Sequence, residues 1–248
     1  MKAMLILELK KNAQDRGLLF WMIILPIAFT VLFISVFTSG VPDADQETVI
    51  LSIVPGYTVM FVFFILISMV NTFLKDRDVG MTARIASTSL SSIKYLLGKW
   101  LPYMFIVWIQ IFILLAFGKL VYQVPLGQPW YLLITSAVLA FSATGIGLAL
   151  SMLVHTENMG IALTQVFALG GAMLSGLWMP LEMMPDFMRI IAHGLPQYWA
   201  HQELQDAMNG TLKLSLFAKA TAVVFAYGCI GFLIAFMRYP HFLKKARG

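Results

Sequence analysis

Long uncharged apolar runs, separated by short polar segments, dominate this chain. Asp, Glu, Lys and Arg are absent from six of these runs except near their ends. A helix needs about 20 apolar residues to cross the hydrocarbon core of a bilayer, and in lipid only a helix satisfies all backbone polar groups of an open segment. The pattern therefore predicts an all-α integral membrane protein with six transmembrane helices, at 18–38, 50–74, 100–119, 130–154, 159–179 and 218–237.

Glycines occur in and beside the later runs. Small residues let membrane helices approach closely, so a helix seam is expected where they gather. A seam within one chain explains them as well as an interface between two chains does. The positions concerned are Gly145, Gly147, Gly170, Gly171 and Gly176.

The N-terminal segment 1–16 is amphipathic rather than uniformly apolar. As a helix it carries Leu5 and Leu9 on one side and Glu8 and Lys11 on another. This pattern favours a helix lying in the membrane interface over a frayed basic tail.

The segment 75–90 opens with four consecutive charged residues in a chain whose charged fraction is only 12%. Asp76 and Asp78 suit a helix start, because the helix dipole stabilises acidic side chains near an N-terminus. The sequence STSLSS then interrupts the pattern, because Ser and Thr favour turns and caps. We expect a short helix across the base of the bundle, with Arg77 and Arg84 available outside the lipid. A solvated loop would have the same composition.

The segment 180–215 is too apolar for an ordinary loop. Pro180, Pro185 and Pro196 would divide it into short helices. We expect two short helices that dip into the outer leaflet or cap the bundle, and a plain amphipathic surface loop is the alternative.

Composition and charge agree with a membrane protein. The chain is 60% hydrophobic, and its net charge of +5 lies beside the apolar runs, as expected for anchors facing anionic lipid rather than nucleic acid. Thirteen of the 17 Lys and Arg residues fall in 2–16, 75–99 and 238–247, which places both termini in the cytoplasm. The single cysteine, Cys229, excludes an internal disulfide and a Cys-based metal site.

Several kinds of enzymatic chemistry are missing from the sequence. No Gly-x-x-x-x-Gly-Lys-Ser/Thr phosphate loop occurs, so any ATP has to be bound by another chain. The four histidines are spread over different segments and do not form a zinc motif. Spans without ionisable groups disfavour proton relays and suit an amphipathic or lipid-like cargo, although lipid alone would also demand uncharged spans.

The segment DRDVGMTARIASTSLSSIKYLLGKWL resembles the signature region of ABC-2 type transporter permeases. Val79, Met81 and Ser89 depart from that pattern, at a basic residue, a Thr and a Pro. The matching residues are Asp76, Arg77, Asp78, Gly80, Arg84, Thr88, Ser91, Leu96, Leu97, Gly98 and Lys99. A second stretch, LSGLWMPLEMMPDFMRIIAHGLPQYWAHQEL, is similar to the family's pattern before its last span, through Leu174, Ser175, Gly176, Pro180, Met184, Pro185, Pro196 and Tyr198. The resemblance covers essentially the whole chain as a single transmembrane domain, 1–248.

The resemblance implies roles for particular residues. A coupling helix would contact a separate cytoplasmic ATPase subunit, which would bind ATP and Mg²⁺, while this chain would hold no cofactor or metal. Its contact residues would be Asp76, Arg77, Asp78, Gly80, Met81, Arg84 and Ile85, with Glu157 as a secondary contact. Short external re-entrant helices would close the outer end of the pathway, with an external gate formed by Gly176, Pro180, Met184, Pro185, Pro196 and Tyr198.

On these grounds the sequence predicts the permease subunit of a bacterial ABC exporter in the plasma membrane. Its cargo would be a hydrophobic or amphipathic drug, antimicrobial peptide or lipid-linked molecule. Its partners would be the ATPase, a second copy or paralogue of this chain, and membrane lipid, with no nucleic acid. A membrane scaffold or sensor of the same architecture is the alternative, and an intramembrane enzyme has little support because the spans lack a polar centre.

Overall fold

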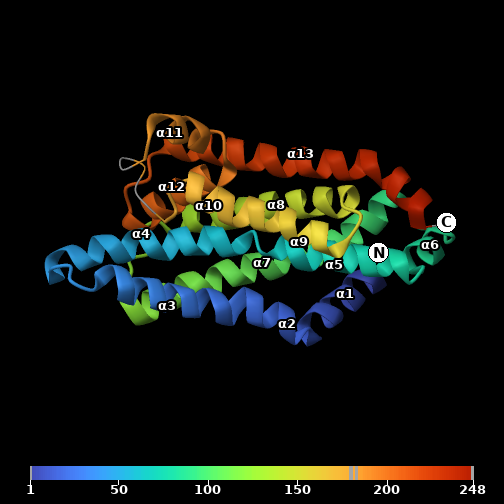
Figure 1. The fold of residues 1–248 in the computed structure, drawn as a ribbon, viewed down its shortest axis with the longest axis horizontal. Helices are drawn as coiled ribbons and strands as arrows, with labels where there is room; N and C mark the ends of the chain where they lie inside the picture. The colour runs from blue at the N-terminus through green and yellow to red at the C-terminus, as the bar shows by residue number, and fades with distance from the viewer. Residues whose placement is uncertain (1, 179–180, 182–183, 247–248) are drawn as a thin grey trace.

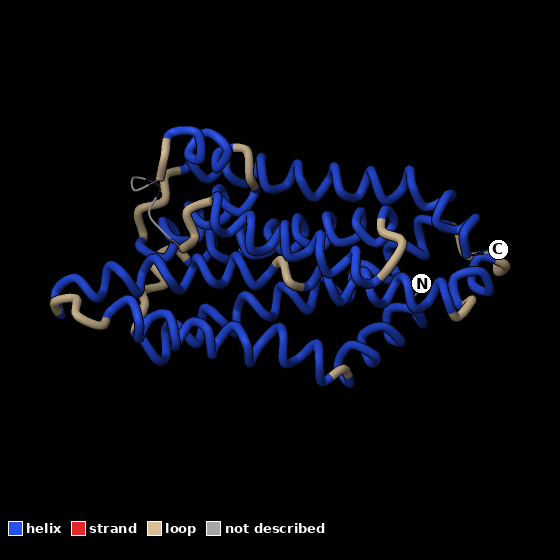
Figure 2. The backbone as a smooth tube through the Cα atoms, in the orientation of Figure 1, coloured by secondary structure: helices blue, strands red, loops and turns tan. Residues whose placement is uncertain are grey.

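The computed structural model describes residues 2–178, 181 and 184–246 and shows a bundle of long helices that run along one axis (Figure 1). Loops gather mainly at the two ends of the bundle, and no strand occurs in the described ranges (Figure 2). Both chain ends lie at the same end of the bundle as the short helix α6 (Met81–Ala86). We call this the α6 end and the opposite one the α11 end, after helix α11 (Asp186–His193).

Five helical segments are long and apolar enough to cross a membrane. The first combines α2 (Arg16–Leu19), the π-helical turn η1 (Phe20–Ile24) and α3 (Leu25–Thr38), and the second combines α4 (Asp43–Val62) and α5 (Ile65–Asp78). The other three are α7 (Ser92–Tyr122), α8 (Pro129–Leu153) and α13 (Leu214–Ala246). The all-helical fold is thereby confirmed, and five of the six predicted spans coincide with segments that are able to cross a membrane by length and composition.

The sixth span, predicted at 159–179, is not among these five segments. That region forms α9 (Glu157–Gln165), the π-helical turn η2 (Val166–Gly170) and α10 (Gly171–Leu174). The helix ends at Ser175, and Gly176 follows with φ of 78°, a left-handed conformation that suits glycine. The run is therefore shorter than its hydrophobic pattern indicated, and a sixth span stays a prediction.

Short helices occur in the described parts of the segments where they were predicted, while their interfacial and re-entrant placement stays a prediction. Residues 1–16 give α1 (Lys2–Gln14), and the segment after the fifth run gives α11 and α12 (Pro196–Asn209). Pro185 precedes α11 and Pro196 is the first residue of α12, where the fixed φ of proline is tolerated. Pro180 lies outside the described residues.

One local prediction is wrong. Asp76 and Asp78 do not begin a helix but lie in the last turn of α5, where the helix dipole disfavours acidic side chains. The charged stretch continues the preceding helix, and Gly80, with φ of 72°, makes the turn into α6. Basic partners at these two carboxylates, described below, offset the unfavourable dipole.

The helices form a buried middle and an exposed periphery. We compare the share of buried residues in the most apolar 18-residue stretch of each segment. This share is 78% in the α4–α5 segment and 72% in α8, but only 28% in both the α2–α3 segment and α13. Figure 1 shows α13 and α3 along opposite edges of the bundle with α8, α4 and α5 between them. The exposed faces of the outer helices are apolar, as lipid requires.

Glycines bring α8 and α13 into backbone contact. A Cβ atom on Gly145 would lie 2.6 Å from the Gly228 carbonyl oxygen, and one on Gly231 would lie 2.5 Å from the Gly145 carbonyl oxygen. Gly147 faces Met69 at a similarly short distance, whereas a Cβ on Gly170 would have nothing within 4 Å. The expected seam therefore exists at Gly145 and Gly147 but not at Gly170.

The substitution Gly231→Val should destabilise the fold, because the clashing atoms belong to the backbone of α8 and cannot rotate away. Overpacking of this kind costs about 1–3 kcal/mol. Gly170→Ala is the matched control and should leave stability unchanged or raise it by up to about 1 kcal/mol, because it adds a helix-favouring methyl group in open space. Thermal unfolding in detergent micelles measures both variants, and equal shifts would show that the seam is not tight.

Candidate functional site

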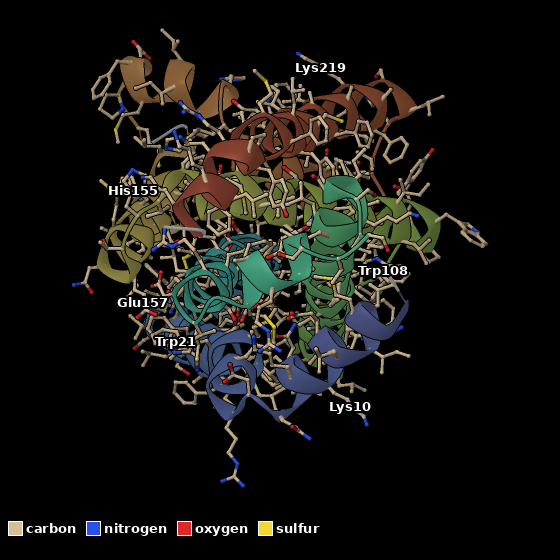
Figure 3. The ribbon with its side chains drawn as sticks, turned by 90° about the vertical axis from the view of Figure 1, so that its right-hand side faces the viewer. Lys10, Trp21, Trp108, His155, Glu157 and Lys219 are labelled. Atoms are coloured by element: carbon tan, nitrogen blue, oxygen red, sulfur yellow. The ribbon has the colours of Figure 1, made fainter. Side chains whose placement is uncertain are left out.

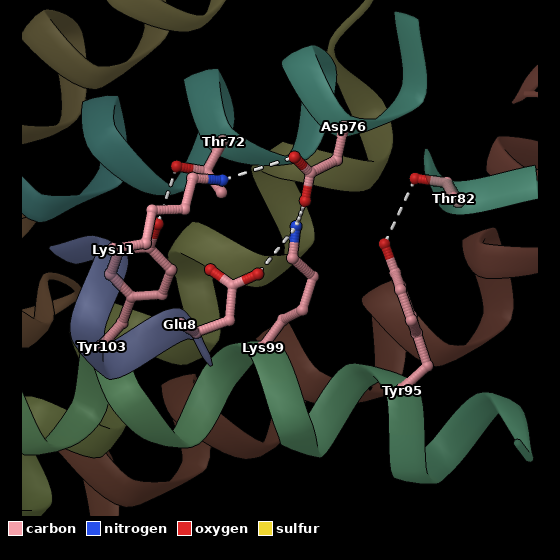
Figure 4. Close-up of polar contacts among 8 residues, drawn as sticks. All are labelled: Glu8, Lys11, Thr72, Asp76, Thr82, Tyr95, Lys99 and Tyr103. Carbon is pink, nitrogen blue, oxygen red and sulfur yellow. Dashed lines mark hydrogen bonds and ion pairs between the residues drawn. The ribbon is translucent and has the colours of Figure 1, made fainter. Parts of the chain in front are cut away.

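A cluster of charged side chains around a buried lysine lies near the α6 end. It consists of Glu8 and Lys11 from α1, Asp76 from α5 and Lys99 from α7 (Figure 4). The Lys99 side chain is 0% exposed and its ammonium group pairs with an Asp76 oxygen and, at 3.7 Å, with Glu8 Oε1. The second Asp76 oxygen pairs with Lys11 Nζ at 3.3 Å. We call these four residues the end cluster.

Two opposite pairs of charges make the end cluster formally neutral. A buried ammonium ion would be costly alone, and the two carboxylates compensate for the water that Lys99 has lost. The ring of Phe73 adds a cation–π contact, with its centroid 4.6 Å from Lys99 Nζ. Because its members come from three elements, the cluster joins α1, α5 and α7.

Two hydroxyl pairs flank the end cluster. Tyr103 donates a hydrogen bond of 2.8 Å to Thr72, and Thr82 Oγ1 lies 3.3 Å from the Tyr95 hydroxyl (Figure 4). Thr82 belongs to α6, whereas Tyr95 lies on α7 and is fully buried. The short helix α6 is therefore anchored to the bundle through its buried side.

The residues predicted as coupling-helix contacts divide into two groups. Asp76 points inward to the end cluster, and Arg77 bonds Asp78 (2.8 Å) and the His155 carbonyl oxygen (3.1 Å). Ile85 and Gly80 are partly buried. By contrast Asp78, Met81 and Arg84 are exposed. The described structure thus makes Asp76 and Arg77 internal links of this chain, and an ATPase contact remains a prediction for all seven.

Val79 forms part of the same surface although sequence reasoning gave it no role. Its side chain is 67% exposed at the turn between α5 and α6, and Met81 beside it is also exposed. Exposed apolar side chains at the end of a bundle, next to exposed charges, are typical of a protein contact. The signal in the sequence was the departure from the family pattern at this position.

Glu157, predicted as a second contact, is exposed in the first turn of α9. It lines a hollow of about 370 Å³, which we call the Trp21 hollow, between the first helical segment, α5 and α9. Figure 3, which looks onto the α6 end, places Glu157 and Trp21 on the same side of the bundle. The hollow is amphipathic: Lys11, Lys75 and Asp15 line it together with a stacked pair of rings, Trp21 and Phe64, whose centroids are 6.3 Å apart.

Residues predicted as an external gate meet in part at the α11 end. Gly176 and Tyr198 line a hollow of about 290 Å³ together with Ser175 and His201. Met184 is buried nearby, and its carbonyl oxygen accepts a hydrogen bond of 3.0 Å from Arg189 Nε. Pro185 and Pro196 lie at the helix starts described above. Of the predicted gate residues, Gly176 and Tyr198 therefore share one hollow. Gating itself stays a prediction.

Sequence reasoning missed a buried acidic side chain in this region, because Glu203 lies in a segment interpreted as external. Its side chain accepts hydrogen bonds from Thr135 of α8 (2.8 Å) and Thr221 of α13 (2.7 Å), and the residue is only 1% exposed. Burial raises the pKa of Glu203 to about 7, although the two hydroxyl bonds oppose the shift. The available signal was its helical spacing from Trp199 and Ala207, which are buried on the same side.

The pKa of His201, two residues before Glu203 on α12, is also shifted, and again the shift favours the neutral form. Burial lowers its pKa to about 4, with a weaker opposing effect from the Ser52 carbonyl oxygen, 3.4 Å from Nε2. At the α11 end burial therefore favours the neutral forms of Glu203 and His201, whereas the end cluster at the α6 end holds paired ions.

Comparison with known proteins gives consistent matches. The family model for the ABC-2 type transporter matches residues 1–209. The chain is similar to the linearmycin resistance permease protein LnrN of Bacillus subtilis, with 28% identity over 71% of this chain and 46% of LnrN. It is 30% identical to the putative transport permease YvfS of the same organism, over 78% of this chain and 79% of YvfS. A probable multidrug ABC transporter permease of Escherichia coli, YbhR, is 28% identical over 46% of this chain and 32% of YbhR. The alignment thus spans less than half the length of LnrN and YbhR and most of YvfS.

Replacing Lys99 should destabilise the chain through the end cluster. Lys99→Met leaves the Glu8 and Asp76 carboxylates without their shared cation, and loss of one partner from a buried pair costs about 3–5 kcal/mol. Lys94→Met, on the exposed side of the same helix, is the control and should shift thermal unfolding by less than about 0.5 kcal/mol. Adding Glu8→Gln to Lys99→Met should restore part of the loss, and equal effects of Lys99→Met and Lys94→Met would contradict the electrostatic account.

Glu203 and His201 should act oppositely on the pH dependence of stability. Folded Glu203 keeps a proton between its ordinary pKa of 4.5 and about 7, so its contribution is complete at low pH and is lost as pH rises through 7. Folded His201 stays neutral between about 4 and its ordinary 6.5, so its contribution is complete above pH 6.5 and is lost as pH falls through 4. Between pH 4.5 and 6.5 the two groups change the free energy of unfolding with pH in opposite directions, so their effects cancel.

Removing either group should reveal the effect of the other on the pH dependence of the free energy of unfolding. In chemical unfolding at pH 4.5–6.5, Glu203→Gln should gain stability with rising pH relative to wild type, and His201→Asn should lose it. Each change of slope is at most about 1.4 kcal/mol per pH unit. Profiles that stay parallel to that of the wild type would mean that neither group is held in its neutral form.

Proposed function

Because this chain belongs to the ABC-2 type transporter family, we propose that it is the membrane-spanning permease subunit of an ATP-driven exporter. Family membership supports a transport subunit that is not itself an enzyme. The energy source, the cargo and the assembly are our inferences, and ATP with Mg²⁺ would be bound by a separate ATPase subunit.

The observation that carries the proposal is the construction of α6. This helix lies at the end of the bundle and presents Met81 and Arg84 outward, next to the exposed Val79 of the preceding turn, while Thr82 anchors it to Tyr95 of α7 (Figure 1). A docking element has to combine an exposed contact face with a rigid attachment. The exposed residues would sit in a groove of the ATPase subunit, as expected for a coupling helix.

Motion of α6 would reach the transmembrane helices along two connections. α5 runs directly from the α6 turn to Ile65 in the middle of the bundle, and Asp76 near its end joins α1 and α7 through the end cluster. Arg77 bonds the His155 carbonyl oxygen just before α9. Closure of two ATPase subunits would therefore act on α1, α5, α7 and α9 together, with Glu157 as a second contact.

The cargo we infer is hydrophobic or amphipathic: a drug, an antimicrobial peptide or a lipid-linked molecule. The Trp21 hollow supports this class, because its aromatic pair would receive an apolar group while Ser68 and Asn71 would bond a polar one. The names of two relatives refer to linearmycin resistance and to multidrug transport, which supports the same class.

For the membrane orientation, we infer a bacterial plasma membrane with the α6 end in the cytoplasm. The concentration of Lys and Arg in segments that reach this end supports it. In this arrangement α1 lies at the inner interface, α9–α10 forms a sixth span, and α11 and α12 are external re-entrant helices around the gate. A second copy or a paralogue would complete the pathway.

The test is copurification and ATP hydrolysis with a cognate ABC ATPase subunit. Arg84→Glu should lower ATPase recovery about tenfold, a loss of 1.4 kcal/mol that is typical for one charged contact at an interface. Thermal stability should not change, because Arg84 is exposed. Lys94→Glu, an equal charge reversal on α7, is the control and should retain the ATPase.

The choice of variant follows from the structure. Asp78→Lys is suitable because its carboxylate is exposed, whereas Asp76→Lys would disrupt the end cluster and confuse unfolding with uncoupling. If Arg84→Glu and Asp78→Lys both keep full recovery and full ATP hydrolysis, α6 is not the coupling helix. If no ATPase is recovered even with the wild type, the scaffold or sensor function gains support.

A further inference from the structure

A second hollow opens on the other side of the first helical segment. Its volume is about 310 Å³, and it lies between α1, α2–η1 and α7. Leu18 and Met22 line both this hollow and the Trp21 hollow, so they form the wall between the two. We call the second hollow the Gln110 groove. Its wall includes the π-helical turn η1, an element found frequently at functional sites.

Two buried amides line the Gln110 groove and lack hydrogen bonds. Gln110 is 2% exposed, and both its Nε2 and its Oε1 are without a partner among the described residues. Asn12 of α1 is 3% exposed, and its Nδ2 is likewise unpaired within the described chain. A buried polar group that lacks a hydrogen bond destabilises the fold, because it has lost its bonds to water without replacing them. Gln110 lies in the middle of an otherwise apolar predicted span, so a bound molecule that pairs with it would remove a substantial cost.

The remaining lining is apolar, and part of it is exposed on the surface of the bundle. Exposed side chains of Leu9, Leu19, Phe105 and Ile109 surround the amides, and no charged side chain is among the described residues that line the groove. In a bilayer this rim lies against acyl chains rather than water. The groove has roughly ten times the volume of one water molecule in the liquid, so one water would not fill it.

From these features we propose that the Gln110 groove binds an uncharged lipid from the surrounding membrane. One acyl chain lies along Ile109 and Leu19, and a hydroxyl or ester group bonds the Gln110 amide and Asn12. An amide both donates and accepts, which matches a hydroxyl group. A charged headgroup does not fit at this depth, because no opposite charge lines the groove. Binding of this lipid does not require that the chain exports anything.

The experiment uses the full chain in phosphatidylcholine vesicles with a photoreactive monoacylglycerol that carries a diazirine in its acyl chain. After illumination, labelled peptides are identified by mass spectrometry. We expect labelling within 105–113 of α7. Gln110→Leu should lower this labelling about fivefold, which corresponds to one hydrogen bond of about 1 kcal/mol.

Matched controls separate hydrogen bonding from simple burial. Ser35→Ala removes a polar group from an exposed side of α3 and should not change labelling. A diazirine alkane without oxygen should label wild type and Gln110→Leu equally, and Ile109→Trp should block both probes by filling the groove. Gln110→Leu should fold at least as well as wild type, because it removes an unpaired amide from an apolar site.

Three results would overturn the inference. Equal monoacylglycerol labelling of wild type and Gln110→Leu would show that the amide does not select the lipid. Labelling that avoids 105–113 would show that the groove is not occupied by lipid. Absence of labelling together with disulfide-linked dimers of Ile109→Cys, in a Cys229→Ser background, would show that a second copy of this chain covers the groove.

Discussion

The ammonium group of Lys99 lies where water does not reach it, and the arrangement of the α6 end follows from how that charge is balanced. Two carboxylates balance it, and they come from segments far apart in the chain: Glu8 near the N-terminus and Asp76 at the end of α5. Glu8 of α1 therefore faces inward and is buried, while Ile6 and Leu7 beside it are exposed. It also holds the end of α5 against α7, and α6 takes its position from both.

The hydrophobic pattern was sufficient for most of the fold. Uncharged runs located the five long segments, and the prolines at 185 and 196 marked the starts of α11 and α12. Pairing between distant residues was not predictable in the same way. Asp76 and Asp78 look like a helix start when only the local dipole is considered, and nothing local reveals that Lys99 and Lys11 reach Asp76. Glu203 was missed for a related reason, because its partners Thr135 and Thr221 lie on other helices.

Buried polar side chains are compensated in different ways at the two ends of the bundle. At the α6 end, ions of opposite sign compensate one another, so removing either one leaves an uncompensated charge. At the α11 end, Glu203 and His201 are held by hydroxyl and carbonyl groups, and their burial favours the uncharged forms. Sequence patterns identify Gly176 and Tyr198 there by resemblance, but only the folded chain shows that they share a hollow with His201.

The backbone contact between α8 and α13 limits how this bundle can change shape. Where Gly145 meets Gly228 and Gly231, backbone atoms of the two helices face one another directly, with the Phe141 ring beside Gly228, so sliding or tilting one helix against the other would bring backbone into backbone. Such a contact resists relative movement of the two helices more strongly than an interface of side chains, which can repack. The packing is looser on the opposite edge, where hollows lie on both sides of Leu18 and Met22. We therefore expect a change of shape to cost less at the first helical segment than at the contact between α8 and α13.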